Sequence, residues 1–193
     1  GSSQFAARQV ASLKSMNSGD TYSNTHRAGN LIRYSFKTGN VIDTLIKIDE
    51  LQASIKDFRY SDYSFCKDEK KVLLTTASEA IYRHSTKANF YVFDFKSRKL
   101  TAVSEKGKQM YAQFNPTGSM VAFVRDNNLY LKNLSDLSEK MVTNDGKKNF
   151  IINGVLDWVY EEEFSFSQGY QWSNDGKYLA YYRFDESNVK EFT

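Results

Sequence analysis

The sequence predicts an all-β fold made of repeated antiparallel sheets, and three observations support this prediction. The 193-residue chain holds 13 Tyr and 14 Phe but a single Pro, and aromatic side chains pack well on pleated surfaces. Short segments in which apolar and polar residues alternate dominate the chain, as is typical of half-buried strands. Two strand-turn-strand motifs also recur at intervals of about 40 to 60 residues, the scale of a propeller blade. These intervals predict a fragment of a β-propeller.

The first motif is a strand that ends in a short polar turn. Residues 32–36 (IRYSF) alternate in polarity, and the turn at residues 37–40 (KTGN) follows them. The same arrangement returns at residues 91–95 (YVFDF), and in part at residues 129–131 (LYL). Each of these segments therefore predicts a strand followed by a reversal of the chain.

The second motif is a tight turn between two strands. Residues 114–123 (FNPTGSMVAF) and 172–181 (WSNDGKYLAY) match position by position. Residues 65–74 (FCKDEKKVLL) are a weaker copy, with Glu69 where the other two have glycine. The polar turn residues favour a backbone with positive φ. We expect Phe65, Phe114 and Trp172 to occupy equivalent positions.

Counting the motifs divides the chain into a lead-in and a row of blades. Residues 1–30 are expected to be an irregular lead-in, with a short helix possible between Phe5 and Met16. Residues 31–193 are expected to form a partial propeller of three to four blades. The blades are expected at residues 31–48 (the end of a first blade), 58–104, 109–143, and from about residue 150, the last one cut off at Thr193. A β-sandwich with coincidental turns is the alternative.

Composition excludes several classes of function. Hydrophobic content of 40% and charged content of 25% are typical of a soluble globular protein. A net charge of +3, with scattered Lys and Arg, predicts no nucleic-acid partner. No apolar run is long enough to span a membrane, and no secretory segment opens the chain. Cys66 is the single cysteine, so we expect no internal disulfide and no thiolate metal site, and we expect a buried strand cysteine at that position. No cofactor is expected.

Residues 157–164 (DWVYEEEF) interrupt the rhythm of the strands. Asp157 is suited to cap a short helix, whose dipole favours acidic residues in its first turn. Such a helix would project Glu161 to Glu163 from a blade, with Trp158, Tyr160 and Phe164 as anchors. Anchored carboxylates can receive charge-assisted hydrogen bonds from the three donors of a primary ammonium group. The alternative is an acidic run on a solvated face.

At these residues the chain resembles the dipeptidyl peptidase IV group of the prolyl oligopeptidase family of serine exopeptidases. Residues 157–163 resemble the glutamate motif of that family, which implies that Glu162 and Glu163 bind the α-ammonium group of a peptide substrate. Residues 81–85 (IYRHS) resemble the segment whose arginine holds a substrate carbonyl, which implies this role for Arg83. In the family pattern the side chain equivalent to Glu161 points away from this cavity.

The resemblance also implies an architecture. In that family an eight-bladed propeller covers an α/β-hydrolase domain, so this chain is expected to be the first half of the propeller, without the hydrolase domain. No Gly-x-Ser-x-Gly segment occurs, and the only histidines are His26 and His84. The chain is therefore expected to bind the end of a substrate and to contain no catalytic triad.

The function expected of the parent protein is release of dipeptides, typically Xaa-Pro, from peptide N-termini. The alternatives are a prolyl tripeptidyl peptidase and a non-catalytic propeller that binds other proteins. The expected partners are a peptide with a free N-terminal amine, the rest of the parent chain and, in a dimer, a second copy. The plain N-terminus and the low cysteine count favour an exported protein, periplasmic or at the cell surface.

Overall fold

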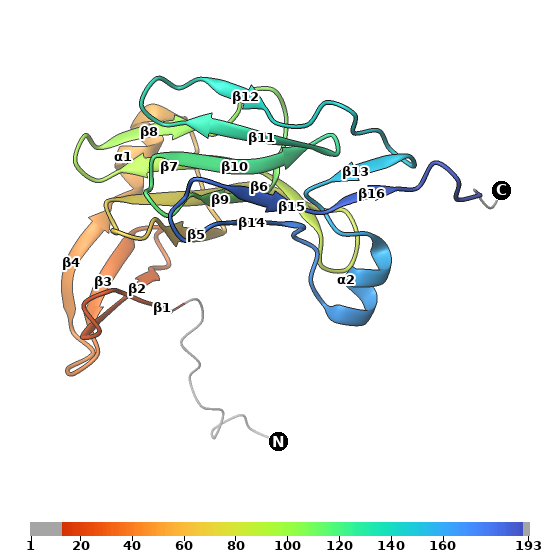
Figure 1. The fold of residues 1–193 in the computed structure, drawn as a ribbon. Helices are drawn as coiled ribbons and strands as arrows, with labels where there is room; N and C mark the ends of the chain where they lie inside the picture. Colours follow the sequence, from red (N-terminus) through yellow and green to blue (C-terminus); the bar gives the residue numbers. More distant parts are fainter. Residues whose placement is uncertain (1–12, 191–193) are drawn as a thin grey trace, which may run out of the picture. The chain divides into compact units, whose positions relative to one another are not determined.

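The computed structural model describes residues 13–190, which form sixteen strands and two helices (Figure 1). The chain divides into two compact units, Gly1–Arg59 and Tyr60–Thr193. Within the described residues, all strand pairing is antiparallel. The predicted all-β class is therefore confirmed. Neither helix is long and apolar enough to cross a membrane.

The first unit contains one complete four-stranded sheet. Its strands, in spatial order, are β1 (Lys14–Ser15), β2 (Thr21–Thr25), β3 (Leu31–Ser35) and β4 (Val41–Ile46). Helix α1 (Ile48–Ser54) follows, and Leu31, Ile46 and Leu51 are fully buried. The prediction of an irregular lead-in up to residue 30 was wrong, because β1 and β2 lie within it. Of the helix suggested between Phe5 and Met16, residues 5–12 lie outside the described part, and Lys14–Ser15 is a strand.

A further copy of the tight turn, missed in the sequence, joins β1 to β2. Residues 15–22 (SMNSGDTY) place Gly19 at φ 75°, and its N–H donates to the carbonyl of Met16 at 3.0 Å. Ser15 pairs with Tyr22 across the turn. Ser15 occupies the position at which the other copies have an aromatic residue. Because the sequence motif includes that aromatic residue, this copy does not match it.

The second unit contains two more complete four-stranded sheets. One consists, in spatial order, of β5 (Asp62–Phe65), β6 (Lys71–Ala80), β7 (Thr86–Asp94) and β8 (Lys99–Ala102). The other consists of β9 (Met110–Phe114), β10 (Met120–Arg125), β11 (Asn128–Asn133) and β12 (Glu139–Met141). In both sheets each strand pairs with the next one along the chain, which is the topology of a propeller blade.

The repeated turns occupy equivalent positions, as the sequence predicts. Phe65, Phe114 and Trp172 each end a first strand and pair across the turn with Val72, Val121 and Leu179. The turn residues Glu69, Gly118 and Gly176 have φ values of 56°, 66° and 70°, and each donates its N–H to a carbonyl three residues earlier at 2.9 Å. Glu69 therefore adopts the left-handed conformation that glycine adopts in the other two copies.

The last part of the chain forms two pairs of strands. Strand β13 (Ile151–Asn153) pairs with β16 (Arg183–Asp185), and β14 (Tyr170–Trp172) pairs with β15 (Leu179–Tyr181). Helix α2 (Trp158–Phe164) lies between β13 and β14 in the sequence and projects from the strands in Figure 1.

Successive sheets of the second unit bury their faces against each other. One buried cluster joins the sheet β5–β8 to the sheet β9–β12; it includes Leu73, Phe90, Val92, Val121, Phe123 and Tyr130. A second cluster joins the sheet β9–β12 to the strands that follow it; it includes Val124, Leu129, Val155, Tyr170 and Trp172. The core therefore lies between sheets, as the repeat architecture requires.

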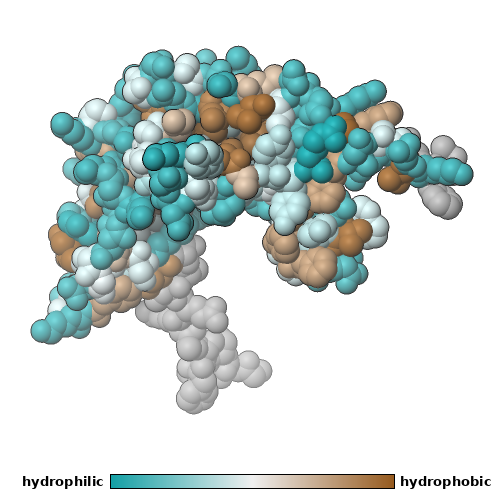
Figure 2. Space-filling model, in the orientation of Figure 1, coloured by the Kyte–Doolittle hydropathy of each residue, from teal (hydrophilic) through white to brown (hydrophobic). Residues whose placement is uncertain are grey.

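Large apolar and aromatic side chains remain exposed on α2 and the last strands, and Figure 2 shows brown and tan surface at α2. They include Phe164, Phe166, Tyr178, Tyr181 and Tyr182. We expect the segment expressed alone to aggregate or to pair, with a second copy or with the rest of its parent chain, because exposed apolar patches favour association. Sedimentation over a range of concentrations measures this. A stable, compact monomer at high concentration would contradict the prediction.

Candidate functional site

The loop that carries Arg83 lies at the tip of a long hairpin. Strand β6 has 10 residues, whereas the equivalent strand β10 has 6. The extra length pairs Ala80 with Thr86, and the N–H of Ile81 donates to the carbonyl of Ser85 at 2.9 Å. The hairpin therefore carries residues 81–85 beyond its sheet.

Helix α2 carries the three glutamates and begins as the sequence predicts. The Asp157 carboxylate accepts hydrogen bonds from the N–H groups of Val159 and Tyr160, both at 3.1 Å. The helix ends at Ser165, whose φ of 57° is left-handed. The aspartate cap is therefore confirmed.

One of the three predicted aromatic anchors holds this helix. The Tyr160 ring lies 5.5 to 6.3 Å from four other rings, those of Phe164, Phe166, Tyr182 and Phe184. By contrast, Trp158 is 66% exposed and Phe164 is 61% exposed. The expectation that these two residues anchor the helix was wrong, because most of each side chain faces solvent.

The three consecutive glutamates point in different directions, because successive residues of an α-helix are about 100° apart. Glu161 is only 4% exposed. Its Oε1 accepts the backbone N–H of His84 at 2.6 Å and that of Ser85 at 2.8 Å. The expectation that all three glutamates project from the blade was therefore wrong for Glu161, which is satisfied by the loop of the β6–β7 hairpin.

Burial and hydrogen bonding act in opposite directions on the Glu161 carboxyl. Burial raises its pKa, but the N–H groups of His84 and Ser85 favour the charged form and outweigh it, so the pKa lies below its ordinary value. Glu161 is thus ionised at neutral pH, and its charge strengthens both hydrogen bonds.

Arg83 and Glu162 meet across the gap between the hairpin and the helix. Arg83 Nε lies 3.0 Å from Glu162 Oε1, and the two side chains are 69% and 18% exposed. The structure therefore brings together two of the three residues predicted to bind substrate.

Glu162 has a second neighbour in the hairpin loop. Its buried Oε1, which lies 3.0 Å from Arg83 Nε, receives no well-directed hydrogen bond from the described residues. The pKa of the Tyr82 hydroxyl is raised, mainly because it hydrogen-bonds to the Glu162 carboxylate. Tyr82 is a neighbour of Glu162 that the sequence analysis did not identify, although it directly precedes Arg83.

Glu163, the third predicted residue, is exposed. Within residues 13–190 no hydrogen bond or ion pair engages its carboxylate, so it is accessible to a ligand. His84 takes part in the site through its backbone N–H, which donates to Glu161. His26 accepts a 3.4 Å hydrogen bond from the N–H of Ala28, in the other unit.

A groove of about 740 Å³ runs beside the hairpin tip and α2. Tyr82, Ser85, Trp158 and Glu161 contribute to its wall, whereas Arg83, Glu162 and Glu163 do not line it. The paired Arg83 and Glu162 therefore lie outside this groove, at an open part of the surface.

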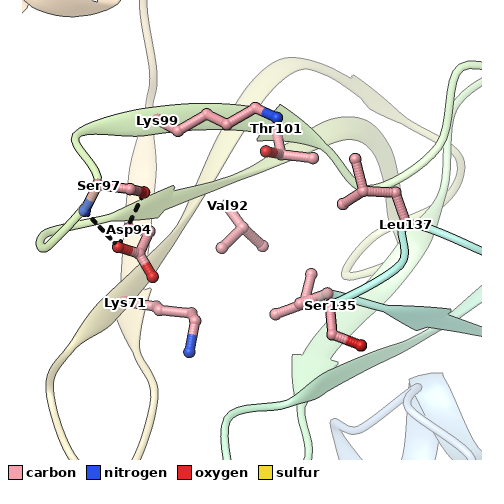
Figure 3. Close-up of a pocket in the computed structure, with 9 residues that line it drawn as sticks. Lys71, Val92, Asp94, Ser97, Lys99, Thr101, Ser135 and Leu137 are labelled. Carbon is pink, nitrogen blue, oxygen red and sulfur yellow. Dashed lines mark hydrogen bonds between the residues drawn. The ribbon is translucent and has the colours of Figure 1, made fainter.

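A smaller pocket of about 160 Å³ lies between the sheets β5–β8 and β9–β12 (Figure 3). Two of its three charged groups are already engaged. Asp94 accepts the N–H of Ser97 at 2.8 Å and its hydroxyl at 3.0 Å, and Lys71 Nζ donates to the carbonyl of Gly118 at 3.1 Å. The third is Lys99, and a single lysine does not suggest a reaction.

The described part of the chain shows no cluster of metal-binding side chains and no activated cysteine. Over residues 13–190, no three His, Cys, Asp or Glu side chains lie close enough together to hold a metal ion. Cys66 is buried, as predicted, and burial and a hydrogen bond to Asp68 raise the pKa of its thiol. A thiol with a raised pKa is a poor nucleophile.

Comparison with known proteins gives consistent matches. Residues 66–193 match the family model described as the dipeptidyl peptidase IV (DPP IV) N-terminal region. The chain is 43% identical over 130 residues to a probable dipeptidyl-aminopeptidase B of Chaetomium globosum, covering 65% of this chain and 14% of that protein. It is 40% identical over 157 residues to dipeptidyl peptidase 4 of Trichophyton rubrum, covering 80% of this chain and 19% of that protein.

A solved structure supports the same relationship. The crystal structure of Porphyromonas gingivalis dipeptidyl peptidase 4 matches with a TM-score of 0.85 and 39% identity, covering 93% of this chain and 26% of that chain. The predicted propeller fragment is thereby confirmed. The chain spans less than a fifth of the length of the two relatives named above and about a quarter of that solved chain.

Proposed function

The chain belongs to the dipeptidyl peptidase IV N-terminal region family, and on this premise we propose that it captures the amino terminus of the peptide that its parent protein cleaves. The parent is proposed to be a serine-type exopeptidase that releases dipeptides, typically Xaa-Pro. Its triad would lie in sequence that this chain does not contain. This chain alone is then expected to bind peptide ends and to cut nothing.

One observation carries the proposal: Arg83, from the β6–β7 hairpin, lies 3.0 Å from Glu162, from α2. Two segments distant in sequence thus bring one cationic and one anionic group together, and Glu163, next to Glu162 in the chain, offers a second carboxylate. An α-ammonium group has three donors, and Glu162 and Glu163 supply carboxylate oxygens that can accept them. Arg83, whose guanidinium is mostly exposed, is the group proposed to donate to a substrate carbonyl.

Capture of the amine would also fix the site of cleavage. If the ammonium group is held at a constant distance from a nucleophile, the number of residues released is constant. The names of the relatives support release of dipeptides rather than tripeptides. Incubating the intact parent protein with a chromogenic Xaa-Pro amide and with longer peptides tests this. Dipeptide products are expected, whereas tripeptide products or the absence of hydrolysis would contradict the proposal.

Capture should depend on pH through the substrate. A free α-amine titrates near ~8, and only its protonated form carries the charge and the third donor that the carboxylates recognise. We therefore expect kcat/KM to fall as pH rises through this value. Two peptides whose amines differ in pKa by about one unit should give midpoints that differ by about as much. Identical midpoints for both peptides would assign the titration to the enzyme and contradict amine recognition.

A further inference from the structure

Glu161 differs from its two neighbours in what it contacts. It is buried, and a single carboxylate oxygen accepts two successive backbone N–H groups, those of His84 and Ser85. These are the two residues that follow Arg83 in the chain. Glu161 therefore binds the loop that presents Arg83, and it does so from the helix that presents Glu162.

Besides Glu161, the loop meets α2 through Arg83 and Tyr82, which both contact the Glu162 carboxylate. Residues 81–84 are exposed, and the backbone hydrogen bonds that close the loop come from Ile81 and Tyr82 to the carbonyl of Ser85, at 2.9 and 3.4 Å. Exposed loops with few packing contacts open readily. The charge-assisted hydrogen bonds of Glu161, at 2.6 and 2.8 Å, are shorter than the 3.0 Å contact between Arg83 and Glu162.

We propose that Glu161 is a positioning residue for substrate capture: it fastens the tip of the β6–β7 hairpin to α2, and so keeps Arg83 beside Glu162. This inference rests on the function proposed above. Glu161 need not touch the substrate, because its effect passes through Arg83. The three glutamates then have two different roles. Glu162 and Glu163 bind the ligand, and Glu161 binds the loop.

Amide hydrogen exchange in the intact parent protein tests the contact between Glu161 and the loop, and it needs no measurement of activity. Glu161→Ala should accelerate exchange of the His84 and Ser85 amides at least about 10-fold, because it removes their acceptor. Glu161→Gln keeps an acceptor oxygen and should have a smaller effect. Peptides that cover the turn at residues 96–99 should exchange at the wild-type rate in all variants. Unchanged exchange at His84 and Ser85 in Glu161→Ala would overturn the inference.

A double-mutant cycle tests whether the effect on capture passes through Arg83. Glu161→Ala alone should lower kcat/KM roughly 10- to 100-fold, mainly through KM, because misplaced binding groups lose affinity. In an Arg83→Met background the same substitution should cost less than about 3-fold, because the group that it positions is gone. Glu161→Gln should restore most of the loss. Equal losses in both backgrounds would overturn the inference.

Two controls separate this inference from its premise. Phe123→Leu weakens the core without touching the loop, and should leave kcat/KM within about 2-fold, which excludes lost stability as the cause. Suppose that Glu162→Gln and Glu163→Gln leave kcat/KM unchanged, while Glu161→Ala still accelerates exchange of the His84 and Ser85 amides. The proposed function is then wrong, but the contact between Glu161 and the loop is confirmed. If both glutamine variants impair capture while Glu161→Ala changes neither exchange nor kcat/KM, the positioning role fails alone.

Discussion

Replacing Glu162 or Glu163 with Gln in the intact parent protein is expected to lower kcat/KM for a free-amine peptide roughly 30- to several-thousand-fold. Gln keeps the size of the side chain but removes the charge that pairs with the ammonium group. Truncating one partner of a buried charge pair typically costs about 2–5 kcal/mol, which corresponds to this range of rates. The side chain of Glu162 is only 18% exposed, so its interaction with a ligand is poorly screened by water.

Two substitutions serve as controls for this measurement. Glu161→Gln should cost far less, because its oxygen still accepts the N–H groups of the hairpin loop. Glu105→Gln, in an exposed connection between β8 and β9, should have no effect. Equal and mild effects at all three glutamates of α2 would mean that Glu162 and Glu163 do not bind the ammonium group.

Phe123→Ala is expected to destabilise the propeller by about 3–5 kcal/mol, the usual cost of removing a large aromatic side chain from a core. Phe123 is fully buried between the sheets β5–β8 and β9–β12, and its ring stacks on Tyr130 with the centroids 5.4 Å apart. The guanidinium of Arg125 lies 4.2 Å from the Tyr130 ring centroid, so the cavity would also loosen a cation–π contact.

Urea unfolding of the parent protein and its variants, followed by tryptophan fluorescence, measures this cost. Phe123→Leu leaves a smaller cavity and should cost less than half as much as the alanine variant. A loss below about 1 kcal/mol for Phe123→Ala would show that the sheets do not depend on this core, contrary to the stacked-blade account.

The repeated turns explain why so much of the fold was predictable. A residue with positive φ four positions after a strand end favours glycine, and Gly118 and Gly176 show this pattern in the sequence. The turn at Gly19 has the same conformation, but Ser15 replaces the aromatic residue that the other copies have, so the sequence pattern does not reveal it. Strands β1 and β2 were missed for that reason.

The site was predictable only in part. The aspartate cap of α2 is a local interaction, and the sequence predicted it from Asp157 alone. Burial of Glu161 depends on a loop more than seventy residues earlier, which no local pattern can reveal. Helical geometry offered one signal, since three consecutive residues of an anchored helix cannot all face the same way.

The exposure of Trp158 was unpredictable for a similar reason. Tyr160 packs against Tyr182 and Phe184, which come from the strand pairs beyond the helix, and this packing decides which face of α2 is buried. Sequence spacing places Trp158 and Tyr160 on different faces, but it does not say which of them meets the strands.

The most direct test of amine capture compares one peptide with its N-acetylated form in the wild-type parent protein and in its Glu163→Gln variant. Acetylation removes the positive charge and leaves a bulky neutral amide, so the two glutamates lose their ligand. The account predicts that the wild type prefers the free amine by at least about 100-fold in kcat/KM, and that Glu163→Gln narrows this preference. Release of dipeptides from the acetylated peptide at a rate comparable to that from the free peptide would contradict it.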